Sequence, residues 1–361
     1  MKATRYVIAL LLILALALAA CGGGTNTAEP ANEPAVVEQP AENVAEEPME
    51  EPAEEVAEEP MEEEPMEEPM EEEPMAEEAM AEDADLDGGF QTFLAGMEGY
   101  NTIGIDALNE MMVENPPFLL DVREPGELTE KGWIEGAVNI PLRQVADNLQ
   151  YLPSFDTTIV SYCGSGWRCT IALTALEALG WEDVRGLTGG SFGGWVEAGY
   201  PIAEGEIPAL VELNAAEPDA AMVAAMQEML HNVPEGFGAI SADDVNTALV
   251  ENPDLILIDA RRPDEVEGKG YIDAPNVSFI PLEEFVNMQD QWPADMDAPI
   301  VVYCGSGHRS TIGMTILWSY GYTDVHSMRG GFGGWTEAGF PAIGVPEPEA
   351  AEGADLDTAF T

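Results

Sequence analysis

Two cysteines stand in nearly the same sequence surroundings, and their neighbours favour chemistry at sulfur. Cys163 begins the run Cys-Gly-Ser-Gly-Trp-Arg, and Cys304 begins Cys-Gly-Ser-Gly-His-Arg. Successive main-chain N–H groups in a glycine loop that leads into a helix form a cradle for an anion. A cysteine in such a cradle has its thiolate form favoured, and the thiolate is the nucleophile. Both runs therefore predict a site that holds a negatively charged sulfur, or a small anion beside it.

The residues that follow each cysteine complete the predicted anion site. Glycine tolerates the positive φ angles that a tight loop requires, and the arginine at the far end of each loop adds a positive charge. The candidate substrate-binding residues are Gly164, Ser165, Gly166, Trp167 and Arg168 after Cys163, and Gly305, Ser306, Gly307, His308 and Arg309 after Cys304.

A short strand and a helix must position each cysteine. An apolar, β-branched run, 158–162 in one copy and 299–303 in the other, ends at the cysteine. Because this run is too short for a helix, it predicts a buried parallel strand. The helices that follow are expected at 170–179 and 310–320, and Gly180 and Gly321 are expected to end them.

The rest of the first copy alternates in the same way. Strands are predicted at 118–122, 137–140, 159–162 and 184–187, and helices near 105–114, 142–152 and 170–179. Such alternation is typical of an α/β fold in which a parallel sheet carries helices on both faces. Sites in these sheets lie beyond the carboxyl ends of the strands, which is where both cysteines fall.

The sequence from residue 93 onward is present twice, with a period of about 140 residues. The run 113–116, Val-Glu-Asn-Pro, returns at 250–253, and the Ile-Pro-Leu of 140–142 returns at 280–282. This period is too long for a solenoid unit and indicates a tandem domain duplication. The predicted domains span 93–203 and 230–343, with a linker and helix at 204–229 and an acidic tail at 344–361.

The N-terminus has the composition of an export signal. Lys2 and Arg5 precede an apolar run, 6–20, that is short for a membrane span and suited to the core of a signal peptide. Leu18-Ala-Ala-Cys21 resembles the bacterial lipobox, in which the cut falls before the cysteine and the cysteine is acylated. We therefore expect a signal peptide at 1–20, a lipidated Cys21 and an extracytoplasmic, membrane-anchored protein. A plain secretory signal or an uncleaved anchor is the alternative, and either also places most of the chain outside the cytoplasm.

Acidic residues dominate the charge of the chain. The net charge is −57, which makes nucleic acid a poor partner, since phosphate binding needs clustered Lys and Arg. Residues 29–87 hold about 26 of the acids and no Lys or Arg, and proline recurs throughout this stretch. We therefore expect 21–88 to be a disordered, self-repelling tether rich in Glu, Pro and Met that holds the domains off the membrane.

Several motifs occur in the same order in both copies, and together they resemble the rhodanese family of sulfurtransferases. The first copy carries Asp121-Val-Arg123-Glu-Pro, then Gly132-Trp-Ile-Glu-Gly-Ala137, then the cysteine loop, then Leu187-Thr-Gly-Gly190 and Trp195. The second carries Asp259, Arg261, Lys269-Gly-Tyr-Ile272, Pro281, the cysteine loop, Gly330-Gly331 and Trp335. The resemblance covers 93–203 and 230–343.

The resemblance implies two tandem rhodanese-like domains that transfer sulfane sulfur. Cys163 and Cys304 would each attack thiosulfate or a similar small anionic donor, release sulfite and hold the sulfur as a persulfide. A thiol or cyanide would then remove the sulfur. Arg168 and Arg309 would help to bind the donor.

The supporting residues in this interpretation are Asp121, Asp259, Arg123 and Arg261. The two aspartates, at the ends of neighbouring strands, are expected to orient loop groups rather than to transfer protons. The interpretation assigns no cofactor and no metal ligand.

Three side chains near the cysteines allow more than one interpretation. Trp167 and His308 are interpreted as rim residues that line the mouth of each site, although a protonated His308 would also lower the pKa of Cys304. Cys169 caps the helix as a small residue, or resolves a persulfide, or closes a disulfide with Cys163. Beyond Cys21 the chain has an odd number of cysteines, which indicates that at least one thiol is free.

Two other functions compete with sulfur transfer. Some phosphatases of related fold also use a Cys–Arg loop, but their loop has five residues between cysteine and arginine, whereas this chain has four, 164–167 and 305–308. The tighter ring favours sulfur over a phosphoryl group. The second alternative is a non-catalytic module that carries sulfur or docks a partner through a rhodanese-like surface.

Overall fold

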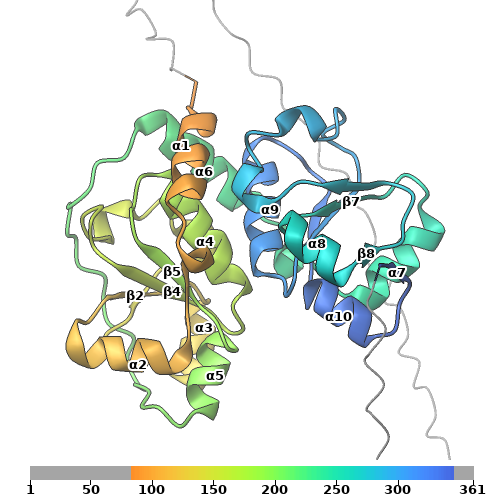
Figure 1. Ribbon diagram of the computed structural model, residues 1–361. Helices are drawn as coiled ribbons and strands as arrows, with labels where there is room; N and C mark the ends of the chain where they lie inside the picture. Colours follow the sequence, from red (N-terminus) through yellow and green to blue (C-terminus); the bar gives the residue numbers. More distant parts are fainter. Residues whose placement is uncertain (1–82, 345–361) are drawn as a thin grey trace, which may run out of the picture. The chain divides into compact units, whose positions relative to one another are not determined.

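The computed structural model describes residues 83–344, which belong to one compact unit. This range contains two copies of one α/β arrangement, each built on a five-stranded sheet (Figure 1). The predicted signal peptide at 1–20, the lipidated Cys21 and the tether as far as residue 82 lie outside the described residues, as does the tail from residue 345. The predicted fold class, two α/β domains in tandem, is confirmed.

All strand pairs of the first sheet are parallel. Its order is β1 (Thr102–Ile103), β5 (Val184–Leu187), β4 (Ile159–Tyr162), β2 (Phe118–Asp121) and β3 (Val138–Asn139). β2 and β4 pair over their whole length, which sets Asp121 opposite Tyr162. The register therefore places the end of β2 beside the end of β4, where Cys163 follows.

Helices cover both faces of this sheet. Leu119 and Val160 belong to an apolar cluster with residues of α2 (Ile105–Glu114), α3 (Pro125–Lys131) and α5 (Ser191–Glu197). Their neighbours Leu120 and Ile159 belong to the cluster formed with α1 (Leu86–Gly96) and α4 (Trp167–Ala178). Successive strand residues point to opposite faces, so these continuously apolar strands supply both cores at once.

The second sheet repeats the first. Its order is β6 (Ala239–Ile240), β11 (Val325–Met328), β10 (Ile300–Tyr303), β7 (Ile256–Asp259) and β9 (Val277–Phe279), again all parallel. α7 (Ala242–Glu251), α8 (Pro263–Lys269), α9 (His308–Ser319) and α10 (Gly331–Glu337) follow the same plan as α2, α3, α4 and α5. β12 (Ala342–Ile343) pairs antiparallel with β8 (Tyr271–Ile272), where the first domain has a single bridge between Trp133 and Ala203.

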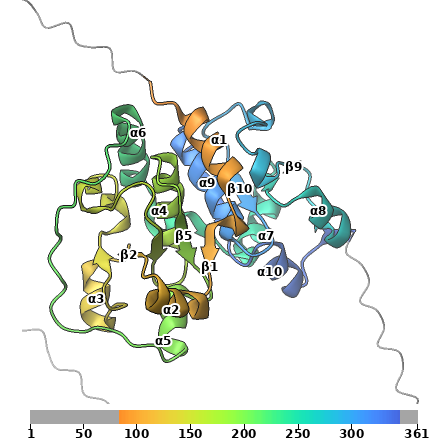
Figure 2. The same ribbon diagram turned by 60° about the vertical axis from the view of Figure 1, so that its left-hand side comes forward.

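The helices that follow the two cysteines pack against each other. α4 and α9 are in direct contact (Figure 2), and one buried apolar cluster contains Ile171 of α4 and Ile312 of α9. α6 (Ala220–His231), inside the predicted linker, contacts both α9 and the turn that begins at Leu142. The two cysteine loops are thus attached to one shared core.

The predicted strands of the first copy are confirmed to within one residue at each end, but the predicted helix at 142–152 is wrong. Two 3-10 turns, η2 (Leu142–Gln144) and η3 (Leu149–Tyr151), occupy this stretch. Asn148 lies between them with φ −126° and ψ 29°, and its side chain donates to the Gln144 carbonyl at 2.8 Å. A local bond of this kind competes with the helix. The other short turns are η1 (Gly99–Asn101), η4 (Glu235–Gly238), η5 (Leu282–Glu284) and η6 (Gln289–Gln291).

Two helices begin earlier than the sequence predicts, and a third was not predicted. α4 begins at Trp167 and α9 at His308, rather than at 170 and 310, so the loop arginines lie in the first helical turn. α1 begins at Leu86, within the last residues of the predicted tether, because Phe90 and Phe93 of this helix pack into the core.

Candidate active site

Cys163 lies where β4 ends and α4 begins, with its sulfur inside the glycine loop. The Gly166 amide donates to Cys163 Sγ at 3.1 Å. Gly166 has a left-handed φ of 109°, which a residue with a Cβ rarely adopts, and it turns the loop onto the N-terminus of α4. Ser191 Oγ, at the start of α5, accepts from the Cys163 amide at 2.9 Å. A main-chain donor and a helix N-terminus therefore both face this sulfur.

Cys304 has the same setting at the end of β10. The Gly307 amide donates to Cys304 Sγ at 3.1 Å, and Gly307 has φ 114°. Ser310 Oγ lies 3.6 Å from the same sulfur. Cys163 and Cys304 are each 1% exposed, so the loops enclose the sulfurs as well as donating to them.

The remaining loop residues connect each loop to the short helix behind it. The Gly164 carbonyl accepts from the Gly193 amide at 3.2 Å, and the Gly305 carbonyl accepts from the Gly333 amide at 3.1 Å. The residues after them, Ser165 and Ser306, are the exposed tips of the loops. Both loops are therefore fixed on one side and most exposed to solvent at a serine.

Each loop arginine is bound by a glutamate of the neighbouring helix. Arg168 Nη1 and Nη2 donate to the two carboxylate oxygens of Glu127 in α3 at 2.6 and 2.9 Å. Arg309 makes the same pair with Glu265 in α8 at 2.6 and 2.8 Å. These hydrogen bonds from Arg309 lower the pKa of Glu265 to about 2. A carboxylate of the chain itself thus occupies the guanidinium groups that were predicted to bind an anionic donor.

Asp121 and Asp259 each bind the arginine two residues further along the chain. The Asp121 carboxylate accepts from Arg123 Nη2 at 2.5 Å and from the Arg123 amide at 3.0 Å. Asp259 and Arg261 repeat this pair at 2.5 and 3.1 Å. All four side chains are buried, so each pair is a structural unit at the end of a central strand.

These aspartates reach the cysteine loop through packing rather than directly. The Arg123 guanidinium lies 3.9 Å from the centroid of the Phe192 ring, and the Phe192 amide donates to the Cys163 carbonyl at 3.0 Å. The second domain repeats both contacts through Phe332. The expectation that the carboxylates orient loop groups themselves is replaced by this indirect connection.

Trp167 and His308 point toward the other domain, and their interpretation as rim residues stays a prediction. Trp167 Nε1 donates to the Phe237 carbonyl at 3.1 Å, and His308 Nε2 lies 2.7 Å from the Tyr100 carbonyl. Their place at the start of two helices that pack together explains this direction. Burial lowers the pKa of His308, so its imidazole is neutral at pH 7 and supplies no positive charge to Cys304. His308 Nδ1 lies 3.0 Å from Thr170 Oγ1.

An aromatic side chain from the opposite domain lies over each loop arginine. The Phe237 ring centroid is 5.2 Å from the Arg168 guanidinium, and the Tyr100 ring centroid is 4.7 Å from that of Arg309. Phe237 and Tyr100 have left-handed backbones, with φ 58° and 59°. The sequence analysis missed both residues, since nothing in their neighbourhood indicates contact with a distant arginine.

Cys169 lies on the first turn of α4, beside the loop of Cys163. Cys169 is fully buried, and its Sγ donates to the Gly166 carbonyl at 3.1 Å. Cys163, Cys169 and Cys304 are all free thiols. Burial raises the pKa of Cys163, but hydrogen bonds from the Cys169 thiol and main-chain amides, together with Arg168, outweigh it and lower this pKa to about 6. Cys163 is therefore a thiolate at neutral pH, whereas the contact with Cys163 holds the pKa of Cys169 well above its usual value.

Two further properties bear on the class of protein. Within residues 83–344, no three His, Cys, Asp or Glu side chains are grouped to hold a metal ion. None of the helices in this part of the chain is both long and apolar enough to cross a bilayer.

Comparison with known families agrees with this geometry. A model of the rhodanese-like domain matches residues 105–198 and 241–338, and each match contains one cysteine loop. The chain belongs to the rhodanese family. Both rhodanese domains therefore carry the cysteine, the glycine loop and the arginine on one scaffold.

Individual relatives resemble a single rhodanese domain of the chain. A protein named sulfurtransferase from Allochromatium vinosum is 32% identical over 108 residues, which is 30% of this chain and 95% of the relative. Thiosulfate sulfurtransferase GlpE from Haemophilus influenzae is 41% identical over 73 residues, 20% of this chain and 62% of the relative. Among solved structures, the polysulfide-sulfur transferase homodimer from Wolinella succinogenes is 31% identical over 29% of this chain and 77% of its own, with a TM-score of 0.27.

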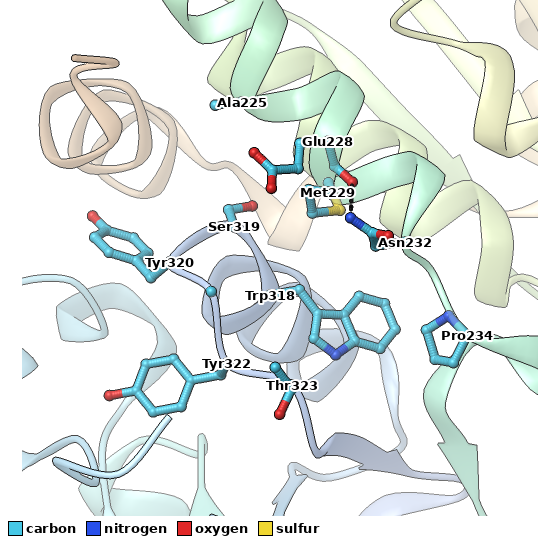
Figure 3. A pocket seen from close by; sticks show the side chains of 11 residues that line it. Ala225, Glu228, Met229, Asn232, Pro234, Trp318, Ser319, Tyr320, Tyr322 and Thr323 are labelled. Carbon is cyan, nitrogen blue, oxygen red and sulfur yellow. Dashed lines mark hydrogen bonds between the residues drawn. The ribbon is translucent and has the colours of Figure 1, made fainter. Parts of the chain in front are cut away.

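A cavity of about 570 Å³ lies between α6 and the end of α9, apart from both rhodanese loops. Figure 3 shows the Trp318 indole, Met229 and Asn232 at this cavity, with Asn232 donating to the Glu228 carbonyl. Its lining contains no residue of either cysteine loop. The cavity belongs to the shared core region and not to the cysteine sites.

The glutamates are the site residues that sequence reasoning missed despite a usable signal. Glu127 and Glu265 stand at the same distance after the repeated Asp-x-Arg motif of each rhodanese domain. An acid repeated at one position in both copies, in a chain whose loops each present one arginine, indicates an ion pair. Ser191 carried no such signal, because its counterpart in the second domain is Gly331.

Proposed function

We propose that the chain is a tandem rhodanese sulfurtransferase in which Cys163 and Cys304 each carry sulfane sulfur. The thiolate attacks the outer sulfur of thiosulfate or a similar anionic donor. The sulfur–sulfur bond of the donor breaks, sulfite leaves with its electron pair, and the cysteine holds the sulfur as a persulfide anion. A thiol or cyanide acceptor then takes the sulfur and restores the thiolate.

The observation that carries this proposal is the amide contact to each sulfur. The Gly166 and Gly307 amides donate to the cysteine sulfurs at the N-termini of α4 and α9. Oriented main-chain dipoles of this kind stabilise a negative charge without reorganisation. The names of the sulfurtransferase relatives point to the same chemistry.

Donor binding at the arginines requires a change of partner. Glu127 and Glu265 hold both terminal nitrogens of Arg168 and Arg309, so an anionic donor competes with these carboxylates. Both ion pairs are bidentate and mostly shielded from solvent, so a donor must offer the arginine equivalent hydrogen bonds to displace the carboxylate. We assign the glutamates as partners that hold the arginines in place between turnovers and that the donor exchanges with.

The burial of both sulfurs favours one alternative, a rhodanese module that binds a partner without turnover. Cys163 and Cys304 are each 1% exposed, so a donor reaches the sulfur only after a local rearrangement of the loop. A module without turnover needs no such opening.

Sulfite release from thiosulfate distinguishes the two functions. The wild type, Cys163→Ser, Cys304→Ser and the double variant are compared with cyanide as acceptor, and each cysteine peptide is weighed for an added sulfur. We expect each single variant to retain one active site and the double variant to lose all sulfite release. Activity in the double variant would reject the cysteine mechanism, and an inactive wild type that gains no sulfur would favour the binding module.

We also propose that the protein is exported and anchored to a membrane through a lipid on Cys21. The support is the sequence at the N-terminus: Lys2 and Arg5, the apolar run 6–20 and the lipobox-like Leu18-Ala-Ala-Cys21. The full chain is expressed in a bacterial host, and its N-terminal peptide is weighed for acyl groups. Cys21→Ser should remove the acyl groups and release the protein from the membrane fraction, whereas Cys304→Ser should do neither. An acyl-free N-terminus in the wild type would refute the anchor.

A further inference from the structure

The first cysteine site contains a second sulfur that is bound to the same glycine as the first. Both Cys163 and Cys169 are held by Gly166, whose amide donates to Cys163 Sγ and whose carbonyl accepts from Cys169 Sγ, each at 3.1 Å. Both cysteines are buried, at 1% and 0% exposure, and both are free. One residue thus fixes a low-pKa thiolate and a protonated thiol side by side.

The second cysteine site offers the matched arrangement with oxygen in place of the second sulfur. Ser310 stands six residues after Cys304, as Cys169 stands six residues after Cys163. Ser310 Oγ lies 3.6 Å from Cys304 Sγ and donates to the Gly307 carbonyl at 2.9 Å. A hydroxyl at this place can hydrogen-bond to a persulfide but cannot exchange with it.

We propose that Cys169 resolves the persulfide of Cys163 and makes the first domain a site that releases hydrogen sulfide, whereas the second domain can only pass its sulfur to an external acceptor. This inference rests on the proposed function, because it needs the Cys163 persulfide. It adds a different product, a different fate for the enzyme sulfur and a residue with a distinct role.

The reaction balances within the first domain. The persulfide anion first takes the Cys169 proton onto its outer sulfur, which leaves Cys169 as the thiolate nucleophile. Cys169 Sγ then attacks Cys163 Sγ, a disulfide forms between them, and the bond from Cys163 Sγ to the outer sulfur breaks. The outer sulfur leaves with that electron pair and its proton as HS⁻. The outer sulfur is reduced, and the two cysteine sulfurs are oxidised to the disulfide. An external dithiol then reduces the disulfide and returns both thiols.

The position of Cys169 favours this route over an external thiol. Because Gly166 holds both sulfurs in the folded site, the reaction is intramolecular and avoids the entropy of bringing two reactants together. The enclosed loop also disfavours larger thiols, since Cys163 is 1% exposed. The raised pKa of Cys169 keeps its proton available for the departing sulfide.

The test compares the two sites in the full chain. Cys304→Ser leaves the first site, and Cys163→Ser leaves the second. Each protein is loaded with thiosulfate, freed of donor by gel filtration, and incubated without oxygen and without added thiol. Sulfide is measured in solution, and the cysteine peptides are weighed. Because trypsin cleaves after Arg168, a disulfide from Cys163 to Cys169 is seen as two linked peptides that separate on reduction.

We expect the loaded Cys304→Ser protein to release sulfide equimolar with its persulfide and to gain the disulfide. The Cys163→Ser protein should keep its persulfide under the same conditions. Adding Cys169→Ser to Cys304→Ser should convert the first site to the behaviour of the second, with the persulfide retained. Adding Ser310→Cys to Cys163→Ser should confer sulfide release on the second site.

The outcomes separate the two proposals. If neither cysteine acquires sulfur, the proposed function fails, and the resolving role fails with it. If Cys163 acquires sulfur but keeps it while Cys169 stays reduced, only the resolving role is overturned. Equal sulfide release with and without Cys169 would also overturn it. The Ser310→Cys variant guards against misfolding of the Cys169→Ser protein, because a gain of sulfide release cannot come from lost structure.

Discussion

The two cysteine sites share their main chain and differ in their side chains. In both, a glycine with φ near 110° directs an amide to the sulfur at 3.1 Å, and a glutamate binds the loop arginine through two hydrogen bonds. The residue six positions after the cysteine is Cys169 in one site and Ser310 in the other. The features that stabilise a negatively charged sulfur are thus the same in both sites, whereas the side chain six residues after the cysteine differs.

The aromatic rings over the two loop arginines also differ between the sites. Tyr100 OH donates to Glu283 at 3.1 Å and accepts from Arg262 at 3.0 Å and from Arg309 at 3.3 Å. Phe237, over Arg168, has no hydroxyl to make such bonds. The second site is therefore surrounded by a polar network at the place where the first has a plain aromatic ring.

The junction between the end of the central helix and the first strand also differs. In the first domain, the half-buried Glu177 accepts from the Val184 amide and the Asn101 side chain, both at 2.8 Å. In the second domain, Trp318 occupies this place, and Gly238 lies so close that a Cβ there would be 2.5 Å from the indole. A titratable contact in one copy corresponds to an apolar one in the other.

The largest expected effect tests what the domains share. Asp121→Asn and Asp259→Asn each remove the charge that balances a buried arginine, and breaking such a pair costs about 3–5 kcal/mol. Urea unfolding should show a loss of stability of this size for Asp121→Asn in the first domain and for Asp259→Asn in the second. Asp264→Asn breaks an exposed pair with Arg262 and should leave the midpoint of unfolding nearly unchanged. If only one of the two substitutions caused a large loss of stability, the two buried pairs would not be equivalent.

The junction provides the next largest effect. Burial raises the pKa of Glu177 to about 7, so the folded state favours the protonated carboxyl, and its contribution to stability is lost as the pH rises through 7. Glu177→Gln keeps an acceptor and removes the charge, and at pH 8 it should stabilise the protein by on the order of 1–3 kcal/mol. The gain should shrink toward pH 4.

Thermal unfolding from pH 4 to 8 measures the effect of Glu177→Gln. Glu130, exposed on α3 in the same domain, is the control, and Glu130→Gln should leave the profile of stability against pH unchanged. If Glu177→Gln raised the stability equally at every pH, ionisation of the Glu177 carboxyl would not be the cause.

At low pH, the activity of the first site should fall because the Cys163 thiolate becomes protonated. Since the pKa of Cys163 is about 6, the sulfite release of Cys304→Ser should fall as the pH drops through 6 and be about tenfold below its plateau at pH 5. Removing the hydrogen-bonding neighbour with Cys169→Ala should raise this pKa and move the fall to higher pH. A profile that stays flat down to pH 5 would exclude the thiolate as the titrating group.

The smallest effect concerns the glutamates that hold the loop arginines. Glu127→Gln in the first site and Glu265→Gln in the second remove a negative charge that competes with an anionic donor. Each should lower the KM for thiosulfate by about two- to fivefold at low salt, with less effect at high salt. Steady-state kinetics in the single-site backgrounds measure this. Glu130→Gln, exposed on the same helix as Glu127, is the control. A raised KM would mean that the pair positions the arginine for the donor.

The sequence predicts the scaffold because each prediction depends on local chemistry. The β-branched run before Cys163 specifies β4, and Gly166 specifies a left-handed turn that few other residues adopt. The predicted helix at 142–152 does not form because the Asn148 side chain donates to the Gln144 carbonyl and so competes with the helical hydrogen bond.

The parts that the sequence did not predict depend on how distant elements pack. The direction of Trp167 and His308 is decided by the contact between α4 and α9, which no motif encodes. Glu127 reaches the loop from α3, a helix too short to show a periodic pattern. Side chains contributed from another element are therefore the residues that a motif search leaves out.

The exchange of Tyr100 and Phe237 between the domains leaves each cysteine site incomplete when its domain is on its own. A fragment that ends before Phe237 leaves Arg168 without its aromatic cover and Trp167 Nε1 without its acceptor. A fragment that begins after Tyr100 does the same to Arg309 and His308. Properties measured on a dissected domain would describe an exposed arginine that the intact protein does not have, so point substitution rather than truncation is the way to silence one site.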